Sequence, residues 1–196
     1  MDTFNYLIVR VEDAYSGTVE TTSGIKFYET VMLNNTSQIN REAEVVSVPK
    51  GVILNEGDKV IIHHNICRKR LSTSGEEIPS DYYIEDNLYF VPLSEVFLYK
   101  RGSKWKALAP YTFVEPIKAD SVKSENLIIP EHFYENAHEG NKHLYGILKY
   151  SNEQLEYFGA KEGDTVIFDK DSEYKFEIDG EVLYKMSTKD ILATVV

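Results

Sequence analysis

A short pattern occurs twice in this sequence, in the same order each time. A Gly-Asp pair precedes a β-branched run at residues 57–62 (GDKVII) and again at residues 163–168 (GDTVIF). A polar segment follows each run and leads to a Leu-Tyr pair, which begins at Leu88 in the first case and at Leu183 in the second. Because a recurring order of motifs is typical of duplicated modules, the pattern predicts two copies of one small all-β unit.

Each copy is predicted to begin with a strand that is followed by a long segment without clear periodicity. The expected early strands are 5–11, 43–48 and 57–62 in the first copy, and 111–115, 144–150 and 163–168 in the second. The long segments are residues 12–41 and residues 116–143. Loops of this length are uncommon in compact domains and are usually functional or disordered.

The domain boundaries follow from the same comparison. Residues 101–110 are small and basic and end with a proline, so they are predicted to join a first domain, 1–101, to a second domain, 107–196. The stretch from the Gly-Asp pair to the Leu-Tyr pair is longer in the first copy. Residues 68–87 are therefore predicted to be an inserted hairpin, and the strand before it is expected to continue through Cys67.

The motifs of the second copy resemble those of the GroES family, the ten-kilodalton co-chaperonins that cap the large chaperonin ring. The segments GDTVI (163–167), EVLY (181–184) and MSTKDILA (186–193) fall in the family's order and close to its spacing. The resemblance covers most of 107–196 and only patches of 1–100. It implies an all-β fold of two tandem GroES-like β-barrels, each with a long mobile loop after its first strand. This tandem form looks like the co-chaperonins that bacteriophages encode.

An apolar triplet, Leu127, Ile128 and Ile129, stands between polar residues in the second long segment. An exposed apolar triplet needs an explanation, because it would leave a sticky patch in water. It could fold back onto its own barrel. The resemblance implies instead that it docks in an apolar groove on the chaperonin, as the triplet in the family's mobile loop does.

The first long segment offers less clear candidates for docking. Ile25 and Phe27 lie near the corresponding distance from their strand, but Lys26 separates them. Residues 31–33 form an uninterrupted triplet farther along. Either could dock, or the segment could pair within the protein.

The composition excludes some partners. A formal net charge of −11 disfavours a nucleic-acid backbone or an anionic membrane as main partner, because both would repel an acidic surface. A single cysteine rules out an intramolecular disulfide and fits a reducing compartment. No apolar run approaches the ~18 residues of a membrane span. We therefore expect a cytoplasmic protein, in the host cytoplasm if it is viral.

His63, His64 and Cys67 form the one cluster that suggests a metal. On a strand, adjacent side chains point to opposite faces, so His63 and His64 are not expected to share an ion. Neither a phosphate-binding glycine loop nor a nucleophile or zinc-protease motif occurs. We expect no metal, no cofactor and no enzymatic activity.

The resemblance implies a co-chaperonin that caps a GroEL-type chaperonin ring through loop docking and assists ATP-dependent folding of client proteins. The protein is then expected to form a homo-oligomeric ring, with a heptamer as one option. The alternative is a non-enzymatic virion or assembly protein that reuses the barrel. A barrel that binds a small ligand in an internal cavity is a third option.

Overall fold

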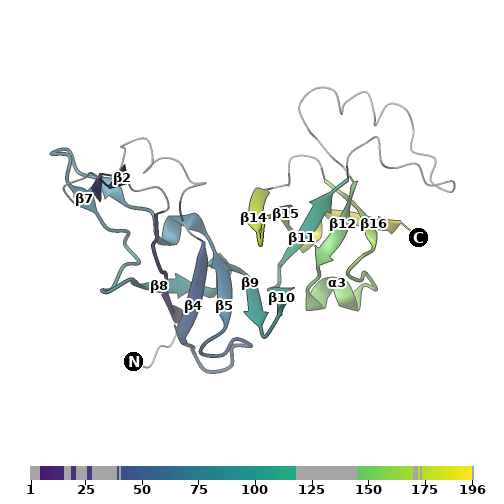
Figure 1. Ribbon diagram of the computed structural model, residues 1–196. Helices are drawn as coiled ribbons and strands as arrows, with labels where there is room; N and C mark the ends of the chain where they lie inside the picture. Colours follow the sequence, from purple (N-terminus) through teal and green to yellow (C-terminus); the bar gives the residue numbers. More distant parts are fainter. Residues whose placement is uncertain are drawn as a thin grey trace. The chain divides into compact units, whose positions relative to one another are not determined.

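The computed structural model describes residues 5–15, 19–20, 26–27, 39, 41–117, 145–169, 172 and 174–195. The chain divides into two units, Met1–Trp105 and Lys106–Val196. Each unit contains one six-stranded sheet (Figure 1). The all-β fold class that the sequence predicts is therefore confirmed. No helix among the described residues is long and apolar enough to cross a membrane.

The first unit has its six strands in the order β10-β9-β5-β4-β1-β8. In chain order these strands are β1 (Tyr6–Arg10), β4 (Glu42–Ser47), β5 (Lys59–Ile62), β8 (Leu88–Pro92), β9 (Val96–Arg101) and β10 (Lys104–Ala107). Two short hairpins lie outside this sheet: β2 (Val19–Glu20) with β3 (Lys26–Phe27), and β6 (Arg70–Leu71) with β7 (Glu77–Ile78). The 3₁₀ helices are η2 (His64–Ile66) and η3 (Leu93–Glu95).

The second unit has the order β14-β15-β11-β12-β13-β16. Its strands are β11 (Tyr111–Pro116), β12 (Tyr145–Tyr150), β13 (Thr165–Phe168), β14 (Tyr174–Ile178), β15 (Glu181–Ser187) and β16 (Ile191–Val195). A short helix, α3 (Glu153–Tyr157), follows β12, and the 3₁₀ helix η5 (Thr188–Asp190) precedes β16.

Five neighbouring strands follow the same order in both units: β8-β1-β4-β5-β9 in the first, and β15-β11-β12-β13-β16 in the second. A register shift occurs between Ile8 and Val9, where β1 pairs with β4. The second unit has its counterpart between Phe113 and Val114, where β11 pairs with β12. The pairings of β5 with β9 and of β13 with β16 also each contain one shift. Positions in one unit can therefore be matched to positions in the other by strand and register.

The two units bury equivalent strands. Val60 and Ile62 of β5 are 0% exposed, and so are Val166 and Phe168 of β13. β-Branched and aromatic side chains suit these strands because they pack well on a pleated surface. Burying each such side chain stabilises the fold by about 1.5–3 kcal/mol. The β-branched runs after the Gly-Asp pairs are thus central core strands.

The Gly-Asp turn before each of these strands is closed by the aspartate. The Asn55 amide donates a hydrogen bond to the carboxylate of Asp58 over 2.9 Å. In the second unit, the Lys161 amide donates to Asp164 over 2.8 Å. An aspartate that accepts from a nearby backbone amide favours a turn over continued strand, which explains why both strands start at this point.

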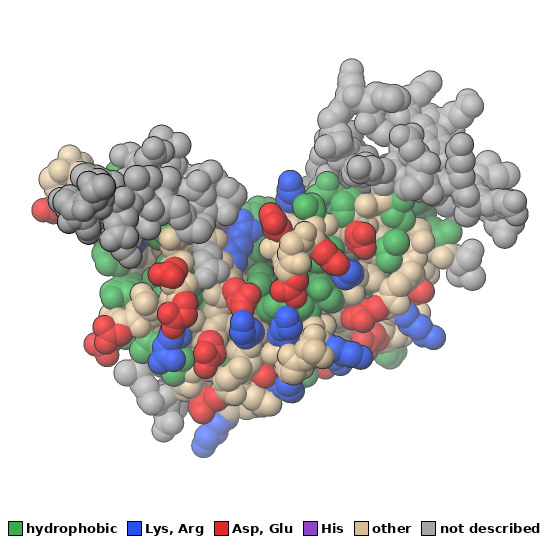
Figure 2. Space-filling view, in the orientation of Figure 1, with side chains coloured by type: hydrophobic (Ala, Val, Ile, Leu, Met, Phe, Trp, Pro, Cys, Tyr) green, Lys and Arg blue, Asp and Glu red, His purple; other side chains and the backbone are tan. Residues whose placement is uncertain are grey.

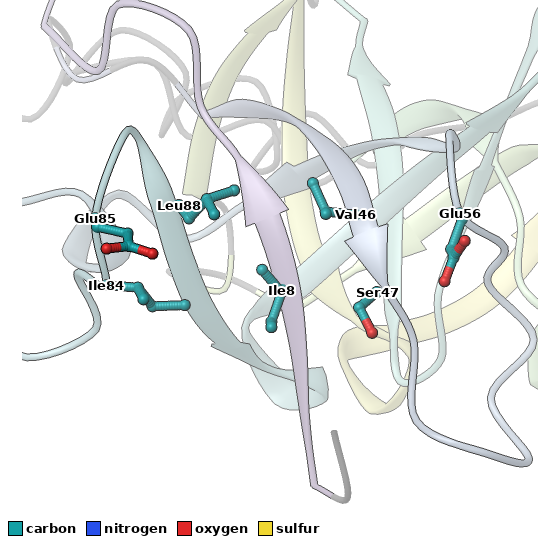
Figure 3. Close-up of a pocket in the computed structure, with 7 residues that line it drawn as sticks. All are labelled: Ile8, Val46, Ser47, Glu56, Ile84, Glu85 and Leu88. Atoms are coloured by element: carbon teal, nitrogen blue, oxygen red, sulfur yellow. The ribbon is translucent and has the colours of Figure 1, made fainter. Parts of the chain in front are cut away.

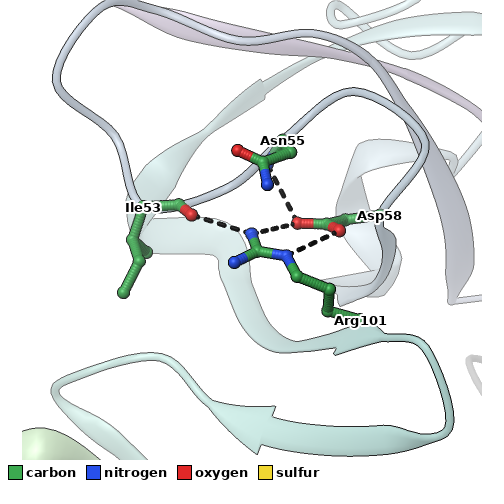
Figure 4. Close-up of polar contacts among 4 residues, drawn as sticks. All are labelled: Ile53, Asn55, Asp58 and Arg101. Carbon is green, nitrogen blue, oxygen red and sulfur yellow. Dashed lines mark hydrogen bonds and ion pairs between the residues drawn. The ribbon is translucent and has the colours of Figure 1, made fainter.

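The first turn has an additional ion pair (Figure 4). The Arg101 guanidinium donates to both carboxylate oxygens of Asp58, at 2.6 and 3.2 Å, and to the carbonyl oxygen of Ile53 at 2.9 Å. Burial would raise the pKa of Asp58, but the hydrogen bonds from Arg101 and from the Asn55 amide outweigh it and lower that pKa. Arg101 therefore ties the end of β9 to the connector that precedes β5.

Two expectations from the sequence are wrong in this region. The strand does not continue to Cys67: β5 ends at Ile62, and η2 begins at His64. The reason is local, since the His63 side chain accepts a hydrogen bond from the Asn65 amide at 3.1 Å and caps the 3₁₀ turn. The rings of His63 and His64 consequently stack at 4.2 Å and do not point to opposite faces.

The segment 101–110, predicted to join the two domains, is partly a strand. It contains β10, which lies next to β9 in the sheet of the first unit. Trp105 in this strand is only 6% exposed, and the Lys100 ammonium lies 5.0 Å from the centre of its ring. The division between the two units falls inside the segment, after Trp105.

Candidate functional site

Most of the residues predicted to dock lie outside the described part of the chain. Leu127, Ile128 and Ile129 belong to this group, as does Ile25. Phe27 lies in β3, where it is opposite Val19 of β2. The structure does describe the residues at which both long segments are attached to their units.

Residues 118–144 leave the second unit between two paired strands. β11 and β12 are antiparallel, and Pro116 lies opposite Gly146 at the end of the ladder. One further backbone hydrogen bond, from the Ile117 amide to the Tyr145 carbonyl at 3.4 Å, closes this end. The segment is therefore attached at two neighbouring points of the sheet, and the free-energy cost of closing a loop grows only slowly with its length.

Gly146 is the tightest point of this attachment. A Cβ atom at this position would lie 2.1 Å from Cγ1 of Val114 and 2.7 Å from the carbonyl oxygen of Glu115. Only glycine fits such a close approach between strands. In the sequence, Gly146 lies inside the predicted strand 144–150. A lone glycine inside a strand pattern was the signal that could have indicated it.

The first long segment is attached through a buried pair. Tyr15 and Ile39 form an isolated β-bridge and are 7% and 3% exposed. The Lys69 amide donates a hydrogen bond to the Tyr15 hydroxyl at 2.6 Å, and the Lys69 ammonium lies 5.5 Å from the centre of the ring. Burial raises the pKa of Tyr15, although Lys69 partly opposes this. The hydroxyl consequently stays neutral and available as an acceptor at ordinary pH.

Lys69 belongs to the inserted hairpin, so this insertion supports the attachment of the first long segment. The hairpin is held by ion pairs from Lys69 to Glu77, at 2.8 Å, and from Arg70 to Asp81, at 2.5 Å. At its base the Ser80 hydroxyl donates to the Ile66 carbonyl at 2.5 Å. The insertion is thus a folded hairpin fixed to the first unit, with a structural role beside any contact role.

A second candidate surface lies beside the last strand of the second unit. The groove has a volume of about 730 Å³. Its apolar lining residues are Pro110, Leu155, Phe158, Ala160, Ile191, Leu192 and Ala193, and its polar ones are Gln154, Ser187, Thr188, Lys189 and Thr194. Two large apolar side chains stand out at its rim, since Phe158 is 71% and Leu192 62% exposed. Tyr157, next to Phe158, is 86% exposed.

A buried polar network fixes the floor of this groove. Asn152 caps α3 by accepting hydrogen bonds from the amides of Gln154 and Leu155, both at 3.0 Å. Its side-chain amide donates to the Tyr111 carbonyl at 2.6 Å and to the Thr188 hydroxyl at 2.8 Å. α3 is therefore locked to β11 and η5, and the exposed apolar side chains stand on a rigid base.

The equivalent strand of the first unit is covered. β9 lies between β5 and β10, and its Phe97 and Leu98 are 2% and 0% exposed. β16 is the outermost strand of its sheet, and Leu192, which matches Phe97, is exposed. Within the part of the chain that the structure describes, the outer edge of β16 has no paired strand. Such an edge can accept another strand.

The described residues include no group of three or more His, Cys, Asp or Glu side chains arranged to hold a metal ion. Burial lowers the pKa of His64 to about 4, assisted by His63, Arg41 and Arg68, so the ring is neutral in the folded protein. Burial also raises the pKa of the Cys67 thiol to about 12. These pKa shifts do not favour His64 as a general base or Cys67 as a thiolate nucleophile.

On the face drawn in Figure 2, acidic and basic side chains are interspersed.

Comparison with known proteins identifies relatives of the second unit. The family model described as "Chaperonin 10 Kd subunit" matches residues 104–195. The co-chaperonin GroES of Cutibacterium acnes is 30% identical over 91 residues, which are 46% of this chain and 93% of that protein. The family-model match includes the attachment point at Gly146 and the edge strand β16.

Proposed function

The chain belongs to the chaperonin 10 Kd subunit family, and on this premise we propose that it is a co-chaperonin that caps a GroEL-type chaperonin ring and assists ATP-dependent folding of client proteins. The observation that carries the proposal is that the family match includes all six strands of the second unit's sheet. The work proposed for this protein is binding, and the nucleotide chemistry belongs to the chaperonin.

Residues 118–144 are the proposed docking loop, with Leu127, Ile128 and Ile129 as the apolar contact. Their attachment at the paired ends of β11 and β12 supports this assignment, because a loop can then order on docking without disturbing the sheet. A segment that orders on binding loses conformational entropy, so a single contact is weak. Several loops on one ring act together and raise the effective concentration. Weak individual contacts would permit both firm capping and release.

We assign the first unit as a diverged GroES-like barrel, residues 1–101, with an inserted hairpin. The shared order of five strands and the matching register shifts support this assignment. Ile25 and Phe27 are its proposed second docking point. A tandem chain of this kind fits a bacteriophage origin and action in the host cytoplasm.

Co-chaperonin function requires assembly, and we propose a homo-oligomeric ring with seven chains. In a heptamer each chain would place its second unit on one subunit of a sevenfold chaperonin ring, so chains with two units would still match seven positions. The exposed edge of β16 and the apolar groove beside it support a contact between chains at this place.

The test is co-sedimentation of the full chain with a GroEL-type chaperonin, with and without ATP. Binding that depends on nucleotide, at seven chains per chaperonin ring, is the expected result. Replacing Leu127, Ile128 and Ile129 by serine should remove this binding. The control replaces Leu71 and Ile78 by serine. Both are exposed apolar side chains, at 41% and 42%, but they lie on the inserted hairpin and not on the proposed docking loop.

Nucleotide-independent binding, or full binding by the triple variant, would contradict the docking role. In that case the second unit would still belong to the family, but the proposal that it caps a chaperonin ring would be wrong.

A further inference from the structure

The first unit contains a pocket of about 300 Å³ on the face of its sheet (Figure 3). It crosses three neighbouring strands, β8, β1 and β4, with Ile8 of the central strand in the middle. The residues around it are Ile8, Val46, Ser47, Glu56, Ile84, Glu85 and Leu88. Its floor is therefore aliphatic, and two carboxylates belong to its rim.

The matching place in the second unit is filled by aromatic rings. Phe113 of β11 contacts Tyr150 of β12 with ring centres 6.2 Å apart, at an interplanar angle of 64°. On its other side it contacts Phe176 of β14, at 5.6 Å and 73°. Both are edge-to-face arrangements, which aromatic pairs prefer. Phe113 is 0% and Phe176 3% exposed, and Tyr150 is partly buried, so the three rings fill this place.

Register places two of the pocket residues at ring positions of this cluster. Ile8 lies opposite Ser47 immediately before the register shift in β1. Phe113 lies opposite Tyr150 immediately before the equivalent shift in β11. Ile8 therefore occupies the position of Phe113, and Ser47 occupies the position of Tyr150.

The third ring position follows from the neighbouring strand. Phe176 lies opposite Leu183 of β15. In the first unit, the Ile84 amide donates a hydrogen bond to the carbonyl of Leu88, the counterpart of Leu183, over 2.9 Å. Ile84 thus takes the place of Phe176. All three rings of the second unit are replaced by smaller side chains in the first, and the pocket is the space that they leave.

The rim of the pocket carries negative charge that the described structure does not neutralise. Glu85 follows Ile84 on one side, and Glu56 lies beyond β4 on the other, with Ile8 between them (Figure 3). Both carboxylates are exposed, and neither has an ion-pair partner among the residues that the structure describes. An occupant with an aromatic ring and flanking positive charges would satisfy both the shape and the charge of this site.

We propose that this pocket is a binding site for an aromatic side chain of a partner polypeptide, a Phe, Tyr or Trp flanked by Lys or Arg. The ring would enter over Ile8 and Ile84, and the flanking cations would pair with Glu56 and Glu85. The site lies outside residues 104–195, so it does not depend on the docking role of the second unit.

The first test uses the full chain with ¹³C-labelled methyl groups and the probe peptide acetyl-Gly-Lys-Phe-Lys-Gly-amide. Ring-current shifts of the methyl resonances of Ile8, Ile84 and Leu88 are expected on titration. Peptides in which Phe is replaced by Ala, or both Lys by Glu, should give no such shifts. Equal shifts with the Ala peptide would overturn the proposal, as would no shifts with the Phe peptide.

The second test fills the pocket with the residue that the other unit carries. Ser47→Tyr should abolish the peptide-induced shifts, and Ile84→Phe provides the same test at a second position if Ser47→Tyr does not fold. The matched control is Val182→Tyr, which adds a ring at a position 41% exposed in the second unit and should bind as the unaltered chain does. Unchanged binding by a folded, filled variant would overturn the proposal.

The third test addresses the carboxylates. Glu56→Gln with Glu85→Gln should weaken peptide binding about threefold to tenfold, the effect expected of two exposed ion pairs. Glu153→Gln with Glu156→Gln changes the net charge equally at exposed positions of α3 and should have no effect. If both double variants weaken binding equally, the effect comes from the net charge of the chain and not from carboxylates at this site, which would contradict the proposal.

Two further outcomes would overturn the choice of occupant. If phenethylamine shifts the same methyl resonances as strongly as the peptide, the site takes a small aromatic amine. If these resonances shift on dilution of the chain alone, the occupant is a second copy of the chain.

Discussion

Gly146 shows how one residue can limit the attachment of a long segment. Its missing side chain allows β12 to approach Val114 and the Glu115 carbonyl more closely than any other residue would permit. The constraint involves backbone as well as side chain, so it cannot be relieved by a rotamer change alone. It lies where residues 118–144 return to the sheet.

We expect Gly146→Ala to lower the free energy of unfolding by about 1–3 kcal/mol, the usual effect of overpacking a closely packed site. Urea unfolding of the chain measures this. Val114→Ala removes the nearer contact, so the double variant should lose less than the sum of the two single losses. Strictly additive losses would show that the contact with Val114 is not the cause.

His64 makes the first unit sensitive to acid. Its pKa is lowered from 6.5 to about 4, chiefly by burial, so the folded protein keeps it neutral while the unfolded chain takes up a proton below pH 6.5. Stability is therefore fully present above pH 6.5 and is lost as the pH falls toward 4. The loss can reach about 3 kcal/mol at 1.36 kcal/mol per pKa unit.

The measurement is urea unfolding at pH 7, 5.5 and 4.5, followed by the fluorescence of Trp105, the sole tryptophan, which is buried in the first unit. His64→Gln should reduce the dependence on pH across this window. An equally steep dependence in this variant would assign the acid sensitivity to other groups.

At the scale of elements, β9 and β16 occupy equivalent positions in the two sheets but have different surroundings. β10 covers β9, whereas the outer edge of β16 is unpaired in the described structure. The difference shows in the side chains, since Phe97 is 2% and Leu192 62% exposed. An apolar strand edge next to an apolar groove is a surface suited to association between chains.

Leu192→Glu should therefore weaken assembly while leaving the chain folded, because the side chain is mostly in solvent already. Sedimentation velocity should show smaller species than for the unaltered chain, and circular dichroism should be unchanged. Val182→Glu is the control, since Val182 is 41% exposed on β15, away from this edge. Unchanged assembly of the Leu192 variant would exclude β16 from the contact.

At the scale of the whole molecule, two units with the same strand order have different tasks in our proposal. The second unit carries the family match and the proposed docking loop. The first carries the inserted hairpin and the pocket proposed to bind an aromatic side chain. A chain ending after Ala107, which keeps β10, should consequently fail to co-sediment with the chaperonin, even when circular dichroism shows that it is folded. Retained nucleotide-dependent docking would transfer the docking role to the first unit.

Much of the strand framework was predictable from sequence because its causes are local. The β-branched runs after both Gly-Asp turns form β5 and β13 as expected, and the Leu-Tyr pairs lie in β8 and β15. The predictions failed where a side chain acts on the backbone a few residues away. His63 capping η2 is one such case, because a hydrogen bond to the Asn65 amide outweighs strand propensity.

The sequence by itself determined the all-β class and the family of the second unit, because turn residues and the alternation of apolar and polar side chains can be read along the chain. Only the tertiary structure decided what the units differ in. The covered edge of β9, the open edge of β16 and the pocket over Ile8 depend on which strands become neighbours. Ser47 at the position of Tyr150 would not leave a pocket by itself. The pocket forms because Ile8 and Ile84, on the neighbouring segments, are also smaller than the rings at the matching positions.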